Sequence, residues 1–393
     1  MRFRPTSLAS LFLTILFFNF LTWAQSTAIY VESNRADHNS LLAFRNTDGT
    51  LSPLGEFPTG GKGVFDLSLQ LGPFDSDQNV ITNPEGTALY AVNSGSDTIA
   101  VFHVTADGKL LTLSGSPFAS GGTNPVSVGI ARDTLAVVNK AMDPSRPQLK
   151  QPNYTSFALL PGGAIQDGPL STNVAPVGSS PSQADVSSGA RLIFDVQFLG
   201  GHLQSFLVAH DGSLIPEDFK AVDTSAGPQP LGLWTHPARP ILYAGLTSSD
   251  QLAVYTFDST GHLSFVRSVP NSGKAICWIR SNATGTRLYT SNTGDSSISV
   301  YDSTSPFHPV EIEHLKLKGI GNPLQLTLDP RGDFLYVLTQ RASPSIPLGQ
   351  GNTLHVLRIN KATGRLSGDS FVELPVPPGT RPQGIAAVEL ARH

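Results

Sequence analysis

The sequence predicts an all-β fold, a β-propeller of seven four-stranded blades. Three observations indicate it: a sequence motif, here called the phrase, that recurs along the chain, short strand-like runs separated by Gly and Pro, and the lack of a long amphipathic helical pattern. The clearest copy of the phrase runs through Asn83–Asn93 and Ile99–Phe102 to the turn Asp107-Gly108. One such unit cannot bury both faces of its small sheet, so neighbouring units must stack into a ring.

The number of blades follows from the strand that ends in a Leu-Tyr pair in the clearest copies and in another apolar residue in the rest. Successive copies lie about 45 to 60 residues apart, a spacing typical of propeller blades. The residues that mark these strands are Tyr30, Tyr90, Leu135, Phe194, Tyr243, Tyr289 and Tyr336. Seven markers predict seven blades.

Within each copy the residue types match their expected places. Thr98–Val104 is rich in β-branched and apolar residues, as a strand packed on both faces should be. Tight turns follow, and we expect their glycines to adopt positive φ. These glycines are Gly108, Gly212, Gly261 and Gly364. In the last copy an insertion at 341–351, rich in Pro, Ser and Gly, lengthens the loop before the third strand.

The two ends of the chain predict how the ring closes. The run 28–32 already matches the second strand of a blade, and no copy of a first strand precedes it. The last apolar run, 385–390, looks like that missing innermost strand. We therefore expect blade one to combine three N-terminal strands with one C-terminal strand, which leaves no open sheet edge.

The N-terminus predicts export. Arg2 and Arg4 precede an apolar stretch at 8–21, and Ala24 is a small residue suited to cleavage before Gln25. We expect residues 1–24 to be a signal peptide and 25–393 one propeller domain, periplasmic or extracellular, monomeric and free of the membrane after cleavage. The alternative is an uncleaved membrane anchor.

Composition excludes several classes of function. Charged residues make up 14% of the chain and the net charge is −4, with no basic run, which disfavours nucleic-acid binding. The single cysteine, Cys277, lies in an apolar run, so we expect a buried and unreactive thiol. No zinc-type spacing, phosphate loop or nucleophile elbow is present, and we expect neither a metal nor a cofactor.

Candidate ligand-binding residues precede or enter the innermost strands, where propeller loops converge on the central channel. They are Gln183, Gln229, Lys274, Gln325 and Gln383, joined by Lys140 in a long loop of blade three and Glu32 in blade one. The alternative is that the amides among them only satisfy neighbouring backbone groups. The segment 62–77, with Lys62, Asp66, Asp75 and Asp77, is a further candidate for a pocket rim.

The loop at 32–39 in blade one gathers an acid, a base and an imidazole. His38 beside Asp37 is a candidate general base, because histidine titrates near neutral pH. Arg35 or Arg381 is the candidate for stabilising a carboxylate or a developing oxyanion, since guanidinium offers paired donors. The alternative is a solvated loop tip without function.

The repeated phrase resembles that of the seven-bladed lactonase-type propellers, which include 6-phosphogluconolactonases of the cycloisomerase type and 3-carboxymuconate cyclase-like proteins. The resemblance covers about residues 28–390. It implies lactone hydrolysis or formation at the channel mouth without a cofactor, by His, Glu and Arg side chains. A small lactone or a carbohydrate-derived molecule is then the expected ligand.

The chain departs from that family in one loop. Where family members often have Gly-Pro-Arg-His before an inner strand, residues 227–230 read Gly-Pro-Gln-Pro, without the basic and imidazole groups. The phrase at 89–102 also resembles the YVTN-type repeat of exported surface propellers. Two functions therefore stay open, a lactonase and a non-catalytic propeller that binds a ligand or a surface.

Overall fold

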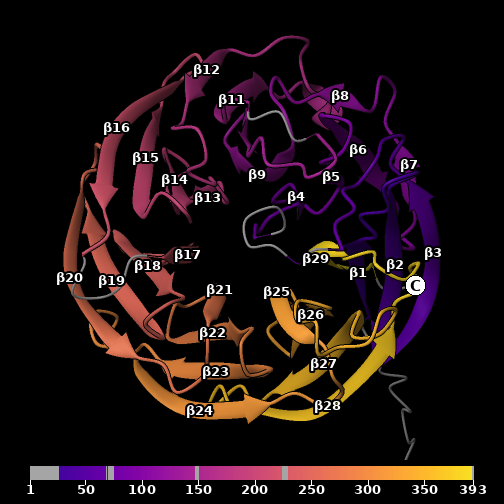
Figure 1. The fold of residues 1–393 in the computed structure, drawn as a ribbon, viewed down its shortest axis with the longest axis vertical. Coiled ribbons are helices and arrows are strands. Elements are labelled where there is room, and N and C mark those ends of the chain that lie inside the picture. Colours follow the sequence, from indigo (N-terminus) through magenta and orange to yellow (C-terminus); the bar gives the residue numbers. More distant parts are fainter. Residues whose placement is uncertain (1–25, 68, 70–74, 147–149, 224–228, 392–393) are drawn as a thin grey trace, which may run out of the picture.

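The computed structural model describes residues 26–67, 69, 75–146, 150–223 and 229–391. Seven antiparallel sheets are arranged around a central channel, as predicted (Figure 1). The described residues contain no α-helix, only a short 3-10 turn at Pro161–Gly163. They therefore include no helix that is long and apolar enough to cross a membrane. The predicted signal peptide, 1–24, lies outside the described residues.

The sheets follow one another around the ring in sequence order. Blade one comprises β29 (Gln383–Glu389), β1 (Ser26–Glu32), β2 (Ser40–Thr47) and β3 (Thr50–Pro58). Blade two comprises β4 (Val80–Thr82), β5 (Ala88–Asn93), β6 (Thr98–Val104), β7 (Leu110–Thr112) and β8 (Phe118–Ala119). Blade three comprises β9 (Pro125–Ala131), β10 (Thr134–Asn139), β11 (Asn153–Ala158) and β12 (Ser171–Val174).

The remaining four blades have the same order, from the channel outward. Blade four comprises β13 (Asp185–Val186), β14 (Leu192–Gln197), β15 (His202–Val208) and β16 (Leu214–Ala221), and blade five β17 (Pro230–Thr235), β18 (Ile241–Leu246), β19 (Gln251–Phe257) and β20 (Leu263–Pro270). Blade six comprises β21 (Ile276–Ser281), β22 (Arg287–Asn292), β23 (Ser297–Asp302) and β24 (Val310–Lys316), and blade seven β25 (Asn322–Leu328), β26 (Phe334–Gln340), β27 (Thr353–Ile359) and β28 (Leu366–Glu373).

The predicted closure of the ring is confirmed. The C-terminal strand β29 pairs antiparallel with β1, and Ile29 lies opposite Ala387. Figure 1 shows β29, at the end of the colour range, beside β1 and β2 at its beginning. The inner strand of blade one, β29, is therefore paired with the second strand, as in the other blades. This pairing leaves no free inner edge on β1 at the seam.

Blade two differs from the predicted four strands, because its outer strand is broken. Both β7 and β8 pair with β6, at opposite ends of that strand. Between them Ser116 and Pro117 interrupt the ladder, and proline has no N–H to donate. The Ser116 hydroxyl accepts the Val101 N–H at 2.9 Å, which replaces a ladder bond in the gap.

The hydrophobic core is divided among the contacts between neighbouring blades. Seven clusters of buried side chains join neighbouring blades. One joins Tyr30 of blade one to Phe102 of blade two, and another extends over blades five, six and seven. The marker tyrosines also reach the next blade with their hydroxyls: Tyr30 donates to the Gly108 carbonyl at 2.9 Å and Tyr289 to the Gly364 carbonyl at 3.0 Å. The recurrence of tyrosine thus has a physical cause, because one side chain provides both apolar area and a hydrogen bond.

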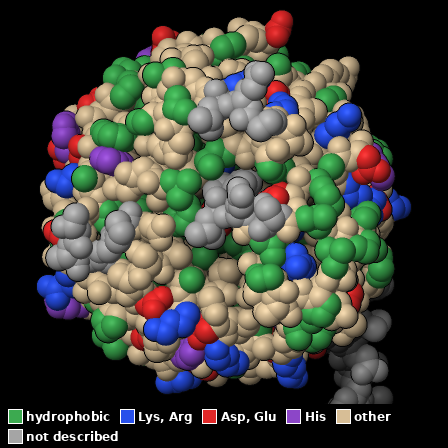
Figure 2. All heavy atoms as spheres, viewed as in Figure 1, with side chains coloured by type: hydrophobic (Ala, Val, Ile, Leu, Met, Phe, Trp, Pro, Cys, Tyr) green, Lys and Arg blue, Asp and Glu red, His purple; other side chains and the backbone are tan. Residues whose placement is uncertain are grey.

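The predicted turn glycines are confirmed, with φ of 83°, 84°, 97° and 79° at Gly108, Gly212, Gly261 and Gly364. Positive φ at four equivalent places explains why the repeat keeps glycine there. On the surface, Figure 2 shows basic and acidic side chains mixed around the periphery of one face.

Candidate functional site

The central channel has two ends, which we define by the direction of the inner strands. At the start end the inner strands β29, β4, β9, β13, β17, β21 and β25 begin, and at the finish end they end. The sequence predicts ligand binding at the start end. The two ends prove to be built very differently.

At the start end the channel holds part of the chain itself. Residues Asp75–Asn79, which we call the channel segment, lead from blade one into β4. The Ser76 carbonyl accepts the Gln325 side-chain amide at 2.6 Å, and the Asp75 carbonyl accepts the Lys140 ammonium. The Asp77 N–H donates to the Ser182 carbonyl at 3.2 Å. Blades three, four and seven therefore all contact this one segment.

Four of the predicted ligand-binding residues lie around the channel segment. Lys140, Gln183 and Gln325 are fully buried and Gln383 is 4% exposed. Gln183 donates to the Gln78 side chain at 3.0 Å, and the Gln383 side chain accepts the Asn79 amide at 3.4 Å. All four side chains contact the channel segment, so the groups they bind belong to this chain. Their role toward a ligand stays a prediction.

Burial changes the proton affinity of two charged groups near this segment. It lowers the pKa of the Lys140 ammonium to about 8, against the opposing effect of Asp75 and Asp195. It raises the pKa of the Asp195 carboxyl to about 7, although Tyr154 donates to that carboxylate at 2.7 Å. Asp195 also accepts the Ser182 N–H at 2.9 Å. These groups hold the loops of the start end together.

The remaining predicted ligand residues lie apart from the segment. Lys274 is exposed and pairs with Asp250 at 2.8 Å. Gln229 is half-buried, and its carbonyl accepts the Thr247 N–H at 2.9 Å. The Gly227-Pro228 part of its loop lies outside the described residues. Glu32 is buried beneath the Asn39 amide, which donates to it at 2.7 Å, and burial raises the pKa of its carboxyl well above the usual range.

The blade-one loop places its acid, imidazole and guanidinium together on the surface. His38 and Asp37 are 2.8 Å apart and largely exposed. Arg35 lies 3.4 Å from the His38 ring, but it also pairs with Glu56 at 2.5 Å and donates to the Pro375 carbonyl at 2.6 Å. Arg35 thus ties the loop to its surroundings. The catalytic role of the pair stays a prediction.

Arg381, the other predicted oxyanion-stabilising residue, is buried. Its Nε donates to the Gln340 side chain at 2.6 Å, and its carbonyl accepts the Asn34 amide at 3.0 Å. Burial lowers the pKa of the guanidinium to about 10, while Asp75 and Asp66 act in the opposite direction. The carboxylates near Arg381 therefore come from the segment between blades one and two.

At the finish end the channel is hollow. A cavity of about 370 Å³, which we call the channel cavity, is bounded by residues of β4, β9, β13, β17, β21, β25 and β29. Its polar lining consists of Gln78, Thr82, Asn83, Asp185, Arg280 and Thr327, with Trp234 among the apolar residues. A concave site with few polar groups that converge is the usual form of a ligand site.

Asp185 is the acid of the channel cavity. It is 2% exposed, and one carboxylate oxygen accepts the Thr235 N–H at 2.8 Å. Burial raises the pKa of this carboxyl to about 7, although the Arg280 cation lowers it. At neutral pH both protonation states are therefore populated, which suits a group that takes up and returns a proton.

Arg280 is the cation of the channel cavity. Its guanidinium lies 2.5 Å from the Asp77 carboxylate and 4.7 Å from the centre of the Trp234 ring. It also donates to the Ile279 carbonyl at 2.8 Å. Three partners fix the guanidinium in orientation, and a fixed cation beside an acid can stabilise developing negative charge. The sequence analysis did not select Asp185, Arg280 or Trp234.

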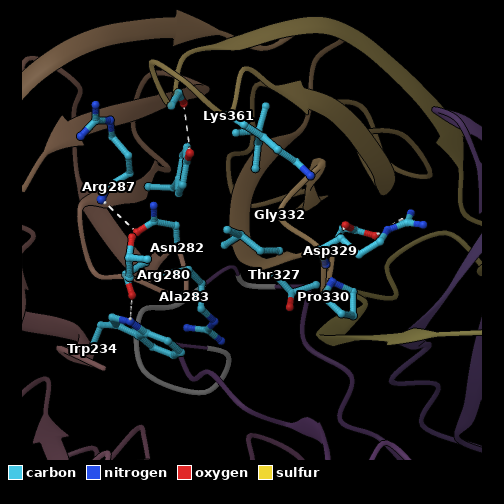
Figure 3. Close-up of a pocket in the computed structure, with 17 residues that line it drawn as sticks. Trp234, Arg280, Asn282, Ala283, Arg287, Thr327, Asp329, Pro330, Gly332 and Lys361 are labelled. Atoms are coloured by element: carbon cyan, nitrogen blue, oxygen red, sulfur yellow. Dashed lines mark hydrogen bonds and ion pairs between the residues drawn. The ribbon is translucent and has the colours of Figure 1, made fainter. Parts of the chain in front are cut away.

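A second cavity of about 440 Å³, the interblade pocket, adjoins the first between blades six and seven (Figure 3). Trp234, Arg280 and Thr327 line both cavities. Figure 3 shows Trp234 at one side of the pocket and Lys361 at the other. The described residues hold no cluster of three side chains suited to a metal ion.

Comparison with known proteins agrees with this architecture. Residues 233–378 match the family model described as "Lactonase, 7-bladed beta-propeller". No curated protein matches the chain at a significant level.

Solved structures similar to this chain have low sequence identity. The periplasmic gluconolactonase of Pseudomonas aeruginosa has 16% identity and a TM-score of 0.70 over 93% of this chain and all of that one. A Bacteroides uniformis protein provisionally assigned as a 6-phosphogluconolactonase has 15% identity and a TM-score of 0.69 over the same shares. A Lactobacillus plantarum protein has 17% identity and a TM-score of 0.66. At such identity these structures support the fold alone. The family match itself confirms, over residues 233–378, the resemblance to the seven-bladed lactonase propellers.

Proposed function

We propose that this protein is an exported hydrolase of a sugar or organic-acid lactone, and that the reaction takes place in the channel cavity. The observation that carries the proposal is that Asp185 and Arg280 line the same cavity of about 370 Å³, near enough for the Arg280 charge to lower the Asp185 pKa. The lactonase family match supports the reaction class. The signal-like sequence at 1–24 supports export.

Asp185 and Arg280 are suited to different halves of the reaction. The Asp185 carboxylate takes a proton from water as the water oxygen forms a bond to the lactone carbonyl carbon. The Arg280 guanidinium stabilises the negative charge that then develops on the carbonyl oxygen. When the ring C–O bond breaks, the Asp185 carboxyl returns its proton to the departing ring oxygen. The product is the open hydroxy acid, and the aspartate ends as it began.

A panel of sugar and organic-acid lactones tests the proposal with purified protein lacking residues 1–24. Asp185→Asn should lower turnover about 100-fold or more, the usual size of an acid–base contribution. Asp195→Asn is the matched control, because that carboxyl has a similarly raised pKa but is enclosed by Tyr154 and Ser182. The control should keep most of the activity if it folds, which a melting curve checks.

His38→Ala decides between the two candidate sites. If turnover falls with His38→Ala and not with Asp185→Asn, the blade-one loop is the active site and the channel-cavity assignment is wrong. If no lactone is hydrolysed above background, a propeller that binds a ligand without catalysis replaces the enzyme. N-terminal sequencing of protein recovered outside the cytoplasm tests cleavage after Ala24.

A further inference from the structure

The channel segment, Asp75–Asn79, contacts residues of several different blades. Its partners at the start end are Lys140, Ser182, Gln325 and Gln383, and deeper in the channel Asp77 pairs with Arg280. These residues belong to, or directly adjoin, strands of blades one, three, four, six and seven. A segment held from five directions lies on the axis of the ring.

Burial shows that the segment fills the channel at this level. Ser76 and Asn79 are fully buried, and Asp77 is 1% exposed. Lys140 and Gln325, which reach it from the blades, are fully buried too. A ligand entering from the start end would have to break these hydrogen bonds, and unpaired buried polar groups are costly.

At Gln78 the segment changes from filling the channel to bordering the cavity. Gln78 is half-buried and lines the channel cavity, whereas its neighbours on both sides are buried. Its φ is 61°, an unfavourable value for this residue type. Two bonds hold it there: its N–H donates to the Asp77 carboxylate at 2.8 Å, and its carbonyl accepts the Val128 N–H at 3.1 Å. Such a backbone persists only where surrounding contacts determine it.

We infer that the channel segment is a fixed floor that makes the channel one-ended, so that a ligand reaches Asp185 and Arg280 only through the finish end. The same floor gives Asp77 a positioning role, since Asp77 holds the Arg280 guanidinium against the cavity at 2.5 Å. The inference rests on the proposed function only where it takes a lactone as the ligand that enters the channel.

Thiol labelling tests the floor without any substrate. In a Cys277→Ser background, Thr327→Cys places one thiol in the channel cavity and Ser76→Cys places one within the floor. In both substitutions the cysteine is similar in size to the side chain that it replaces. With a small maleimide, Thr327→Cys should react at least about 100-fold faster, because a buried thiol reacts only after local opening. Comparable rates for the two thiols would overturn the inference.

The native Cys277 gives a second measurement if Ser76→Cys fails to fold. Its thiol is 3% exposed, lies near Asp75 and accepts the Thr293 hydroxyl at 2.9 Å. In the folded, otherwise unmodified protein it should stay unreacted over the time in which Thr327→Cys is fully labelled. Rapid reaction of Cys277 would show that the start end opens readily and would contradict a fixed floor.

Labelled Thr327→Cys then tests the access route. A maleimide adduct there should abolish hydrolysis of any lactone that the unlabelled variant hydrolyses, and that lactone should slow the labelling. Hydrolysis at an unchanged rate after labelling would overturn entry through the finish end. If no lactone is hydrolysed but the labelling difference persists, the proposed function fails while the floor stands.

The positioning role of Asp77 is tested by Asp77→Asn, which removes the charge that faces Arg280 but keeps the shape. We expect turnover to fall and the acid limb of the pH–rate profile to shift, because Asp77 raises the proton affinity of Asp185. A variant that folds and keeps an unchanged pH profile would contradict this role.

Discussion

The two ends of the channel use the same kinds of residues and arrive at opposite results. At the start end, amide and charged side chains such as Gln325 and Lys140 are hydrogen-bonded to the chain's own segment. At the finish end, Asp185 and Arg280 border a cavity. Polar residues at strand ends therefore do not by themselves mark a ligand site. They are available to a ligand only where the chain does not already satisfy their hydrogen bonds.

The difference arises from one connection. Between β3 and β4 the chain returns through the channel segment, and this contributes Ser76, Asp77 and Gln78 to the interior. Among the described residues the finish end receives no such segment, because in blades two to seven short turns join the inner strands to the second strands there. Figure 1 shows the inner strands arranged around the axis.

Removal of the closing strand should have the largest effect on both ends. Deleting residues 384–393 takes away nearly all of β29, which borders the channel cavity through Ile385–Ala387 and seals blade one. We expect loss of the cooperative thermal transition, since the seam then leaves β1 unpaired on its inner side. Deleting only 391–393 is the control and should leave the melting temperature unchanged. An unchanged melting temperature after the longer deletion would contradict closure of the ring by β29.

Breaking the ion pair between floor and cavity should cost several kcal/mol. Asp77→Asn removes the negative charge that lies 2.5 Å from the Arg280 guanidinium, and Arg280 is only 7% exposed. Loss of one member of a buried pair typically costs about 3–5 kcal/mol. Denaturant unfolding measures the change through the midpoint at constant slope.

Lys274→Met is the matched control for that pair, because Lys274 is exposed and its partner Asp250, in the loop before β19, also accepts the Ala275 N–H at 2.7 Å. Exposed pairs contribute little, so its midpoint should stay near the original value. Equal effects for Asp77→Asn and Lys274→Met would show that the buried pair does not hold the floor.

The fold could be predicted from the sequence because it is repeated. Each copy carries its own strands, and most copies carry a turn glycine or a marker tyrosine, so an error in one copy is corrected by the others. The broken outer strand of blade two was missed, since it departs from the repeat at Ser116 and Pro117.

The site was harder to predict because it depends on one unrepeated segment. That Gln183 faces the channel could be predicted from its position, and strand alternation extends the same face to Asp185. What no pattern indicated is that residues 75–79 occupy the start end and leave the finish end hollow. Long-range placement of a single connection has no local signal in the sequence.

The pH dependence of stability should report the buried acids at the two ends. Burial raises the pKa of both Asp185 and Asp195 to about 7. Between about pH 4 and 7 the folded protein then binds more protons than the unfolded chain, so its stability should fall as pH rises across this window. Below about pH 4 this contribution is fully present.

Asp195→Asn should make that slope shallower, because it removes one of the acids whose pKa is raised by burial. Asp211→Asn, which alters an exposed turn, is the control and should keep the original slope. The measurement is the urea midpoint at several values between pH 4 and 7.5. A stability that rises across this window, with the same slope in all three proteins, would contradict the assignment of raised pKa values.

The smallest effects concern two turn glycines at the finish end, where the space around them differs. At Gly332, which lines the interblade pocket, φ is 70° and an added Cβ would meet no atom within 4 Å. At Gly108, φ is 83° and the Cβ would lie 3.0 Å from the Leu390 side chain and 3.1 Å from Ala28. Gly332→Ala should therefore cost about 1 kcal/mol, from backbone strain alone.

Gly108→Ala adds crowding to the same strain, and we expect about 1–3 kcal/mol in total. Its neighbours cannot move freely, because Ala28 belongs to β1 and Leu390 follows the closing strand β29. The difference between the two variants, measured by denaturant unfolding, isolates the packing contribution, since both positions have similar φ. Equal losses would mean that the pocket beside Gly332 closes around an added methyl group. The finish end would then be hollow only at the channel axis and not between blades six and seven.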